Sequence, residues 1–415
     1  MVISPAEDGS TGLQTPRSAR DNAHPFPHGQ SYLRVGVLAD YLEEGWPSMD
    51  LAAEMLVEHL TRDHAQSVEA TLIRPAFRRR FSQRAGTAGA KWPFSADRLI
   101  NRFWEYPRAL RQQVERFDLF HLVDHSYAQL VQHLPPNRTV VTCHDLDAFR
   151  CLLSDEPGRS WAFRAMAGRI LEGLQRAAVV ICVSSSTRDE ILENGLLPPK
   201  RLVVIPNGIH PACTPQPDPE ADAEAARLLG PLDGQKFEIL HVGSTIQRKR
   251  IDVLLRVVAE VRRSFPTVRL VRVGGDFSRA QQLLVTDLGL TDAVHVLPAL
   301  SRPVLAAVYR RAALLLQPSE REGFGLPIVE ALACGTPVLA SDIPVFREIA
   351  EGVVEFAPVA DRAAWRDASL GLLSERERDA RAWAERRERG IVRAGRFSWA
   401  ENARRTVELY QEMIA

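Results

Sequence analysis

The chain has 415 residues, of which 45% are apolar, and its 52 basic side chains balance 52 acidic ones. This length is too great for one ordinary domain and fits two domains of about 150 to 200 residues each. Zero net charge excludes a global field that recruits nucleic acid or an anionic membrane, so any such contact must be local. No run of about 18 apolar residues occurs, and we expect no membrane-spanning helix.

The N-terminal segment and the cysteines indicate the cellular compartment in which we expect the protein. Residues 1–31 are rich in Pro, Ser, Gly, His and charge and lack the apolar centre of a signal peptide. We therefore expect a disordered tail and no secretory leader. The cysteines form no CxxC pair, and most lie in apolar or motif-rich runs, which favours buried thiols in a reducing, cytoplasmic compartment. They are Cys143, Cys151, Cys182, Cys213 and Cys334.

From Leu33 onwards, short apolar runs alternate with longer amphipathic stretches, which is the pattern of βα units around a parallel sheet. We expect strands at Arg34–Ala39, Val68–Leu72, Leu119–Val123, Thr139–Cys143, Val179–Val183 and Leu202–Ile205. Helical periodicity is clearest at Asp50–Leu60 and Ser186–Glu193. The turn-forming Pro206-Asn207-Gly208 ends this first domain, which we set at residues 32–208.

A second βα series follows a proline-rich connection at residues 210–235. Its expected strands are Phe237–Val242, Val268–Val273, Ala293–Leu297, Ala312–Leu316, Val338–Ala340 and Val353–Phe356. We therefore expect another doubly wound domain at residues 209–395. The charged stretch Ser374–Arg389 is typical of a solvated helix face. Apolar residues at helical spacing in Ser398–Met413 predict a helix, and we expect residues 396–415 to return to the first domain.

The stretch Gln317–Ala340 joins a strand to a glycine-bearing loop and a short helix. Gly323-Phe324-Gly325 predicts a tight turn, Pro327 fits the first helical turn, and Gly335 fits the helix end. The free N–H groups and the dipole at such a helix start bind anions, most naturally phosphate. Two glutamates, Glu322 and Glu330, bracket the helix start, and their carboxylates can accept hydrogen bonds from hydroxyl groups.

Phosphate together with several hydroxyl groups indicates a nucleotide sugar. Either glutamate alone would be explained by complementing the helix dipole, but their joint placement around EGFGLP argues against that explanation. Because ligands of open parallel sheets bind outside the carboxyl ends of the strands, the polar or glycine residues that follow the predicted strands are further candidates. They are Gly45, Asp124, His125, His144, Asp145, Gly243, Ser244, Gly274, Gly275 and Asp276.

The loop GSTIQRKR, which begins at Gly243, ends in Arg248-Lys249-Arg250 before an amphipathic helix at Ile251–Arg262. Cations at this place can neutralise a diphosphate and stabilise it as a leaving group. Taken alone, three basic residues at a loop–helix junction are equally well explained as solvated. His144 also allows two interpretations, a structural cap and a side chain that bonds a sugar hydroxyl or polarises the reaction centre.

The sequence resembles the family-4 retaining glycosyltransferases with the GT-B fold. The resemblance rests on HVGSTIQRK, VRVGGDFS, VYRRAALLLQPS and EREGFGLPIVEALACGTPVLASDIPVFREI within Phe237–Ala350. Weaker matches are VVTCHDL, ICVSSSTRDEI, IPNGI and FSWAENARRTVELY. It implies a fold of two Rossmann-like domains that face each other across a cleft, with a C-terminal helix packed back on the N-terminal domain. The first domain would bind the acceptor and the second the nucleotide sugar.

The resemblance also implies roles for matched residues. Glu322 would contact hydroxyls of the donor sugar, Glu330 the ribose hydroxyls and Lys249 the diphosphate, while His144 matches a histidine near the transferred sugar. The implied catalytic residues are His144, Glu322 and Lys249; the donor-binding residues are Gly243, Ser244, Arg248, Lys249, Gly274, Gly323, Phe324, Gly325, Leu326 and Glu330; the acceptor-side candidates are Gly45, Trp46, Asp124, His125 and Asp145.

Two positions depart from the family's pattern. Ser244 replaces an arginine often found just after the glycine, which makes Arg248 a candidate for a second diphosphate contact. Where many members have paired glycines in the first loop, this chain has Glu43-Glu44-Gly45-Trp46-Pro47-Ser48, so the contacts of that loop stay open.

The function implied is transfer of a sugar, a hexose, from a nucleoside-diphosphate sugar to an acceptor hydroxyl, with retention, in glycan, polysaccharide or glycolipid synthesis. No DxD-like motif stands out, and we expect no required metal, no cofactor and no nucleic-acid partner. Two alternatives stay open: a sugar-nucleotide epimerase of similar architecture, and a non-catalytic transferase-like subunit.

The acceptor is not legible from the sequence. Arg74–Arg84 and Arg102–Phe117 mix basic and aromatic residues. An ordinary solvated loop and helix is the simpler explanation; the alternative is a peripheral contact with the inner membrane face near a lipid-linked acceptor. Trp46, Trp92 and Trp104 fit stacking on sugar rings or packing in a core.

Overall fold

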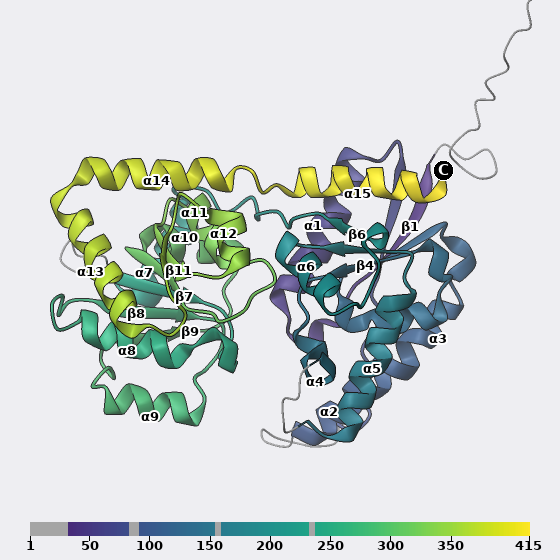
Figure 1. Cartoon of the computed structure of the whole chain (residues 1–415), viewed down its shortest axis with the longest axis horizontal. Coiled ribbons are helices and arrows are strands. Elements are labelled where there is room, and N and C mark those ends of the chain that lie inside the picture. Colours follow the sequence, from purple (N-terminus) through teal and green to yellow (C-terminus); the bar gives the residue numbers. More distant parts are fainter. Residues whose placement is uncertain (1–31, 83–90, 154–158, 232–236) are drawn as a thin grey trace, which may run out of the picture.

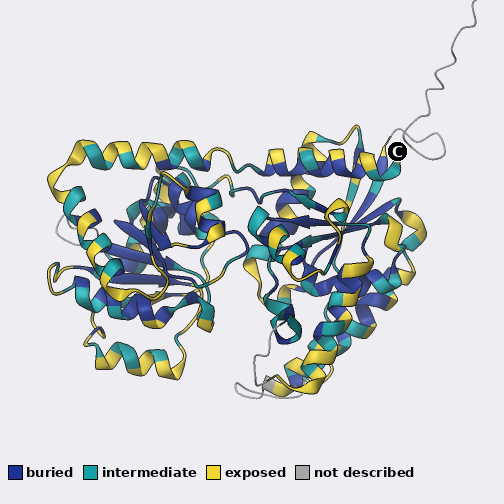
Figure 2. Ribbon diagram, viewed as in Figure 1, coloured by how far each residue is buried: buried dark blue, intermediate teal, exposed yellow. Residues whose placement is uncertain are grey.

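The computed structural model describes residues 32–82, 91–153, 159–231 and 237–415 (Figure 1). The tail expected at residues 1–31 lies outside the described residues. The described residues contain two six-stranded parallel sheets, in the orders β2-β1-β3-β4-β5-β6 and β12-β11-β10-β7-β8-β9. Helices cover the faces of each sheet, and most strands are buried between them (Figure 2). Two doubly wound Rossmann-like sheets were predicted from the alternation of apolar runs, and that prediction is confirmed.

The N-terminal sheet contains all six predicted strands, each within one residue of its expected ends. The strands are β1 (Leu33–Leu38), β2 (Val68–Ile73), β3 (Leu119–Leu122), β4 (Thr139–Cys143), β5 (Val179–Cys182) and β6 (Leu202–Val204). The helices are α1 (Pro47–Asp63), α2 (Lys91–Ile100), α3 (Tyr106–Arg111), α4 (Arg150–Leu153), α5 (Trp161–Arg176) and α6 (Ser185–Glu193). A π-helical turn at Asn101–Glu105 joins α2 to α3.

The C-terminal sheet also has its six predicted strands. They are β7 (Glu238–Val242), β8 (Arg269–Val273), β9 (Val294–Leu297), β10 (Leu314–Gln317), β11 (Val338–Ser341) and β12 (Glu355–Ala357). The helices are α7 (Pro219–Leu229), α8 (Ile251–Val261), α9 (Arg279–Asp287), α10 (Arg302–Arg311), α11 (Leu326–Ala333), α12 (Pro344–Ala350), α13 (Arg362–Arg378) and α14 (Ala380–Ala394). Helix α7 lies in the proline-rich connection, yet Ala221, Ala225 and Leu229 belong to the core of this second unit.

Short 3-10 turns link many of these elements, and they are Leu42–Glu44, Val114–Arg116, His125–His133, Pro136–Arg138, Asp147–Phe149, Pro199–Arg201 and Gln247–Lys249. The charged stretch near Ser374–Arg389 is two helices and not one, because Asp379 interrupts it and accepts a hydrogen bond from the Ala382 N–H at 2.9 Å. The five cysteines are free thiols, and Cys213 is the only one that is not fully buried. Within the described ranges, no helix has the length and apolar character needed to cross a bilayer.

Two segments cross between the sheets side by side. The Ile209 N–H donates to the Phe397 carbonyl at 3.2 Å, and Asn402 Nδ2 donates to the Pro206 carbonyl at 2.8 Å. After this crossing, α15 (Trp399–Ile414) lies along α1 (Figure 1). The predicted return of the C-terminal helix to the first domain is therefore confirmed.

Trp399 starts α15 and holds it against the N-terminal unit. Its side chain packs with Leu51, Ala52 and Met55 of α1. The backbone of Gly208 runs so close to this helix start that a Cβ at Gly208 would lie 2.2 Å from the Trp399 nitrogen. The turn expected to end the first domain therefore requires glycine for steric reasons, since a side chain would collide with backbone that cannot rotate away.

We expect Gly208→Ala to lower the free energy of unfolding by about 1–3 kcal/mol, because the added methyl group overpacks the junction. Gly168→Ala is the matched control, since Gly168 lies inside α5 and its added Cβ would meet nothing within 4 Å. That control should be neutral or gain roughly 0.5–1 kcal/mol from helix propensity. Urea denaturation of the two variants measures both effects, and equal stabilities would contradict the steric explanation.

Candidate active site between the two sheets

Each sheet has one place where the strand order reverses direction, between β1 and β3 in the first and between β7 and β10 in the second. Ligands of such sheets bind at this switch point, beyond the carboxyl ends of the strands. The loops there begin at Ala39 and Val123 in the first unit and at Gly243 and Pro318 in the second. The loop after β4, which begins at His144, joins them.

The two units touch at Gly323. Its carbonyl oxygen accepts hydrogen bonds from Ser184 Oγ at 2.7 Å and from Thr187 Oγ1 at 3.3 Å, both at the start of α6. A Cβ at Gly323 would lie 1.5 Å from the carbonyl oxygen of His144. Because any side chain would fill the space that this carbonyl occupies, only glycine permits the contact. The structure thus brings together Gly323 and His144, which the sequence placed on opposite walls of one cleft.

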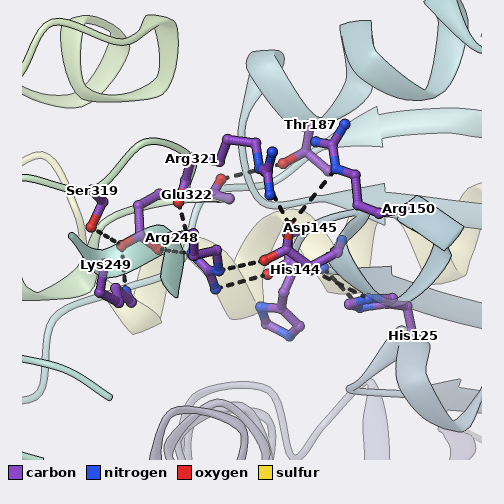
Figure 3. A network of polar contacts seen from close by, with 12 residues as sticks. His125, His144, Asp145, Arg150, Thr187, Arg248, Lys249, Ser319, Arg321 and Glu322 are labelled. Carbon is purple, nitrogen blue, oxygen red and sulfur yellow. Dashed lines mark hydrogen bonds and ion pairs between the residues drawn. The ribbon is translucent and has the colours of Figure 1, made fainter. Parts of the chain in front are cut away.

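Glu322 lies in a cluster of cations (Figure 3). Its carboxylate forms an ion pair with Lys249 Nζ and accepts hydrogen bonds from Arg248 Nη1 at 2.7 Å and Ser319 Oγ at 2.8 Å. Burial opposes ionisation, but the charges of Lys249 and Arg248 prevail and lower the pKa of Glu322 to about 2. Three residues singled out from the sequence therefore form one charged group.

Arg248 connects the two units through its guanidinium group (Figure 3). Besides Glu322, it contacts Asp145 Oδ2 at 3.5 Å and forms an ion pair with Asp147 through Nε. A second cation of the second unit, Arg321, lies with its Nε 3.8 Å from Asp147 Oδ1. Burial and the charge of Asp145 raise the pKa of Asp147, while Arg248 lowers it. A cation of the second unit is thus held by carboxylates of the first.

Asp147 was not among the residues selected from the sequence. The signal was its place two residues after Asp145 in the segment HDLD, where alternate residues of a loop can face the same side. Asp145 was selected, and its Oδ1 accepts a hydrogen bond from the Asp147 N–H at 3.0 Å.

Arg272 holds the glycine loops of the second unit from beneath. It is fully buried in β8, and its guanidinium group donates to the carbonyl oxygens of Gly243 at 2.7 Å, of Gly274 at 3.4 Å and of Gly275. Burial lowers the pKa of Arg272 to about 10, so the side chain stays charged at neutral pH. Sequence analysis missed this residue, although an arginine within the apolar strand RLVRV was a visible signal.

The predicted donor-binding glycines lie close together above Arg272. A Cβ at Gly274 would lie 2.4 Å from the Gly243 carbonyl oxygen, and one at Gly243 would lie 3.8 Å from Lys249 Nζ. Ser244 is half-buried beside them. The loops after β7 and β8 therefore form one surface whose charge comes from Lys249 and Arg248.

Helix α11 begins at Leu326 directly after Gly325, whose φ of 104° is in the left-handed region that favours glycine. No side chain caps this helix start, and Pro327 lies in its first turn as predicted. Its first backbone N–H groups are thus available to an anion. Phe324 packs edge-on against Phe397 at 5.6 Å, and Leu326 packs against the cluster of α1 and Trp399.

Glu330 lies in the body of α11, away from the cationic cluster. Its side chain is buried and accepts a hydrogen bond from the Tyr309 hydroxyl of α10 at 2.9 Å. Burial raises the pKa of Glu330, and the charge of Arg302 opposes that shift. The two glutamates of the motif thus have different surroundings, which the sequence spacing alone did not distinguish.

The histidines of the first unit are held in fixed orientations. His144 Nε2 contacts the Val123 carbonyl at 2.8 Å, and because a carbonyl only accepts, this nitrogen carries the proton. Burial lowers the pKa of His144 despite the nearby Asp124, so the ring is neutral at pH 7. His125 Nδ1 accepts a hydrogen bond from the His144 N–H at 3.2 Å.

A buried carboxyl pair lies at the switch point of the first sheet. Asp124 accepts hydrogen bonds from the Ser126 N–H at 2.8 Å and from Ser126 Oγ at 2.5 Å. Burial and the charge of Asp124 raise the pKa of Asp40 well above its ordinary value. Asp40 follows the first strand's apolar run directly and was not among the residues selected from the sequence.

The atypical first loop is built around a buried glutamate. Glu44 accepts a hydrogen bond from the Tyr127 hydroxyl at 2.8 Å, and its carboxylate lies 3.3 Å from Arg98 Nε and 3.6 Å from Arg102 Nη1. Gly45, with φ of 70°, ends the 3-10 turn. Trp46 then begins the approach to α1 and is 45% exposed. The loop therefore presents Trp46 outward while Glu44 points into the first unit.

The fold and the site define a class of two-domain protein with the GT-B architecture, whose cleft carries cations beside a helix start. The family model "Glycosyltransferase Family 4" matches residues 53–212, and the model "Glycosyl transferases group 1" matches residues 224–389. Together these models cover both units. The chain belongs to the group 1 and family 4 glycosyltransferases.

Individual proteins resemble parts of the chain. A D-inositol 3-phosphate glycosyltransferase of Kineococcus radiotolerans is 30% identical over 60% of this chain and 61% of its own length. The O-antigen chain mannosyltransferase B of Escherichia coli is 29% identical over 66% of this chain and 70% of its own length. Sucrose-phosphate synthase of Thermosynechococcus elongatus has a solved structure that matches with a TM-score of 0.70 at 21% identity, covering 92% of this chain and 98% of that one. The chain spans 45% to 61% of the length of three inositol-phosphate glycosyltransferases that it matches.

We expect Gly323→Ala to separate the two units, because its methyl group would occupy the position of the His144 carbonyl. Each unit keeps its own core, so the variant should stay folded while its radius of gyration in small-angle X-ray scattering increases. Gly371→Ala within α13 is the control, since its Cβ would meet nothing within 4 Å. A scattering curve of Gly323→Ala that matches the wild-type curve would contradict the contact.

The charge of Glu322 makes stability depend on pH. Its pKa is about 2 in the folded protein against an ordinary 4.5, so its ionisation stabilises the folded state above pH 4.5 and this contribution is lost as the pH falls toward 2. We expect Glu322→Gln to lower the free energy of unfolding at pH 7 by roughly 3 kcal/mol.

Denaturant titrations between pH 7 and pH 3 measure this difference, which should shrink below pH 4.5. The control is Glu351→Gln, whose side chain is 68% exposed beside Arg347. The control should change stability by no more than about 0.5 kcal/mol at any pH. A constant difference between wild type and Glu322→Gln would show that another interaction is responsible.

Proposed function

We propose that this protein transfers a sugar from a nucleoside-diphosphate sugar to an acceptor hydroxyl, with retention at the anomeric carbon. The observation that carries the proposal is the cluster of Arg248 and Lys249 around Glu322, next to the uncapped start of α11 and opposite His144. Two cations and a helix start match the charge of a diphosphate. The carboxylate within the same cluster matches sugar hydroxyls.

In this proposal the second unit holds the donor. The diphosphate binds to the N–H groups of the α11 start and to Lys249 and Arg248. The Glu322 carboxylate, already ionised, accepts hydrogen bonds from hydroxyls of the sugar, and Glu330 accepts those of the ribose. Gly243 and Gly274 let the donor approach the backbone closely, and Arg272 keeps both loops in place.

Transfer then exchanges one bond for another. The bond between the anomeric carbon and the diphosphate oxygen breaks, and its electron pair stays on the diphosphate, where Lys249, Arg248 and the α11 dipole stabilise it. The acceptor oxygen bonds to the anomeric carbon on the same face, and the acceptor proton passes to the departing phosphate oxygen. Neutral His144 orients the sugar through the free lone pair of Nδ1. The proposal assigns the balancing of phosphate charge to these cations and not to a metal.

Carboxylates of the first unit support transfer on one face. Asp124 accepts two hydrogen bonds from Ser126, and Asp145 is engaged with Arg248 and the Asp147 N–H. Neither is a free nucleophile. Because Arg248 is shared between Glu322 and these aspartates, we propose that a bound diphosphate replaces Asp145 and Asp147 as its partner.

The transferred sugar is proposed to be a hexose, since a matched relative is a mannosyltransferase. The acceptor is proposed to be the hydroxyl of a glycan or lipid-linked sugar bound at the first unit, near Trp46 and the pair Asp40–Asp124. Synthesis of a polysaccharide or glycolipid in the cytoplasm is the corresponding role.

A sugar-nucleotide epimerase and a non-catalytic subunit are the two alternatives, and one experiment separates all three. The purified protein is incubated with a panel of nucleoside-diphosphate hexoses, first alone and then with sugar, inositol-phosphate and lipid-linked acceptors. Transfer predicts nucleoside diphosphate release that rises with an acceptor, together with a new α-linked product when the donor is α-linked. Isomerised donor without an acceptor would indicate an epimerase, and thermal stabilisation without donor consumption would indicate a binding subunit.

The two glutamates predict different kinetic defects. We expect Glu322→Ala to lower kcat by about 10²–10³, because charge and hydroxyl contacts at the reacting sugar are lost. We expect Glu330→Ala to raise the donor KM by about tenfold or more with little change in kcat, because a ribose contact is made equally in the ground state. Steady-state kinetics with Glu351→Ala as control measure both. Wild-type turnover in Glu322→Ala would sink the assignment, and an unchanged donor KM in Glu330→Ala would exclude the ribose role.

A further inference from the structure

The helical run from α2 to α3 carries large apolar side chains on its outer surface. Trp92 is 68% exposed, Leu99 is 49% exposed and Trp104 is 66% exposed. Phe81, 43% exposed, adjoins Trp92 with ring centroids 6.5 Å apart. We call these four residues the aromatic stripe. Isolated exposed apolar residues are ordinary, but four along one helical run and its attached loop, two of them tryptophans, mark an interaction surface.

A π-helical turn aligns the stripe. Trp92 and Leu99 are seven residues apart and lie on one helix face, where the next member of an unbroken α-helix would be Phe103. The turn at Asn101–Glu105, closed by the Tyr106 N–H to the Asn101 carbonyl, inserts one extra residue. Trp104 therefore takes the outward position and Phe103 is half-buried. From Trp92 to Trp104 the stripe extends about 18 Å along the helix axis.

The loop that carries Phe81 is fixed to this helical run. The Asp97 carboxylate accepts hydrogen bonds from the N–H groups of Arg80 at 3.0 Å, Phe81 at 3.0 Å and Ser82 at 2.9 Å. Asn101 both accepts from the Arg78 N–H and donates to the Arg78 carbonyl, each at 2.8 Å. The backbone that carries Phe81 is thus fixed beside the helix that carries Trp92, Leu99 and Trp104.

The charge around the stripe has one sign. Arg78, Arg79 and Arg80 are exposed in the loop, and Arg108 and Arg111 are exposed on α3. The acidic residues of the run, Asp97 and Glu105, are both buried, Asp97 under the loop and Glu105 in ion pairs with Arg78 and Arg80. Exposed aromatic side chains flanked by arginines have the composition of segments that lie in the interface of an anionic bilayer.

We propose that the aromatic stripe and its flanking arginines dock this protein on the surface of an anionic lipid bilayer, with the α2–α3 run parallel to the membrane. Trp92, Leu99 and Trp104 enter the headgroup region, where tryptophan is favoured. The arginines Arg108 and Arg111 contact lipid phosphates. A protein partner would require a complementary surface, whereas the single sign of charge fits a surface of uniform negative charge.

The position of the stripe in the fold suits this contact. Helix α2 lies at the end of the N-terminal unit remote from α15 and from the segment between α14 and α15, which crosses between the units (Figure 1). A membrane at that end leaves the crossing segments free. Because the side chains of Trp92 and Trp104 are largely exposed, the interpretation that they pack in a core is wrong. Docking is independent of the proposed sugar transfer.

Vesicle flotation tests the proposal. We expect the full chain to float at low salt with vesicles of phosphatidylcholine that contain roughly one third phosphatidylglycerol, and not with pure phosphatidylcholine. Added salt should weaken the binding. Trp92→Ser with Trp104→Ser should lose at least about tenfold in vesicle affinity, since binding scales with buried apolar area. Arg108→Ser and Arg111→Ser should each lose roughly fivefold.

Matched controls lie in the C-terminal unit. Leu283 and Val392 are 57% and 65% exposed, and Leu283→Ser with Val392→Ser should bind vesicles as the wild type does. Arg279→Ser with Arg381→Ser is the corresponding control for charge. Thermal unfolding confirms that each variant is folded, which is expected because all these side chains are exposed. Donor hydrolysis measured in parallel keeps this test separate from that of sugar transfer.

Three results would overturn the proposal. The first is the absence of flotation with anionic vesicles at low salt. The second is wild-type binding by the double tryptophan variant, or an equal loss in the control variants. The third is concentration-dependent dimerisation in sedimentation velocity that the tryptophan substitutions abolish, which would assign the stripe to a second copy of this chain.

Discussion

The close approach of Gly323 to the His144 carbonyl is the constraint on which the site depends. Because no side chain fits between them, the backbones of the two units meet directly, and Ser184 and Thr187 fix the contact by hydrogen bonds to the same glycine. This contact places the carboxylates after β4 against the cations after β7. Without it, each unit would present half of a site to solvent.

Charge balance follows from that contact. Arg248 and Lys249 both contact Glu322, so their positive charges lie close together and repel each other. A buried cation without a partner is strongly destabilising. Glu322 from the second unit and Asp145 and Asp147 from the first neutralise them. A diphosphate carries charge of the same sign as these carboxylates, so it can exchange with them. The arrangement that stabilises the contact between the units is therefore also the one that we propose for recognition of the donor.

The two surfaces of functional interest are built by different means. The cleft relies on glycine, buried Arg272 and residues that face each other from separate loops, so it is rigid at its base and polar at its surface. The aromatic stripe relies on one extra residue in a helix and on the Asp97 carboxylate, which ties a loop to that helix. In both places a buried charged group fixes the backbone that displays the exposed or reacting groups.

The sequence by itself determined the twelve strands of the described residues, the last helix and the glycine-bearing turn before α11, because these features depend on local apolar runs and backbone preferences. Only the tertiary structure decided which side chains meet. Asp147 meets Arg248 and Arg272 meets the Gly243 carbonyl across separate loops, and Asp40 lies near Asp124 of another loop. The outward position of Trp104 depends on a π-turn that periodicity cannot reveal. Contacts between residues far apart in the chain are set by packing of whole sheets, and no local pattern records them.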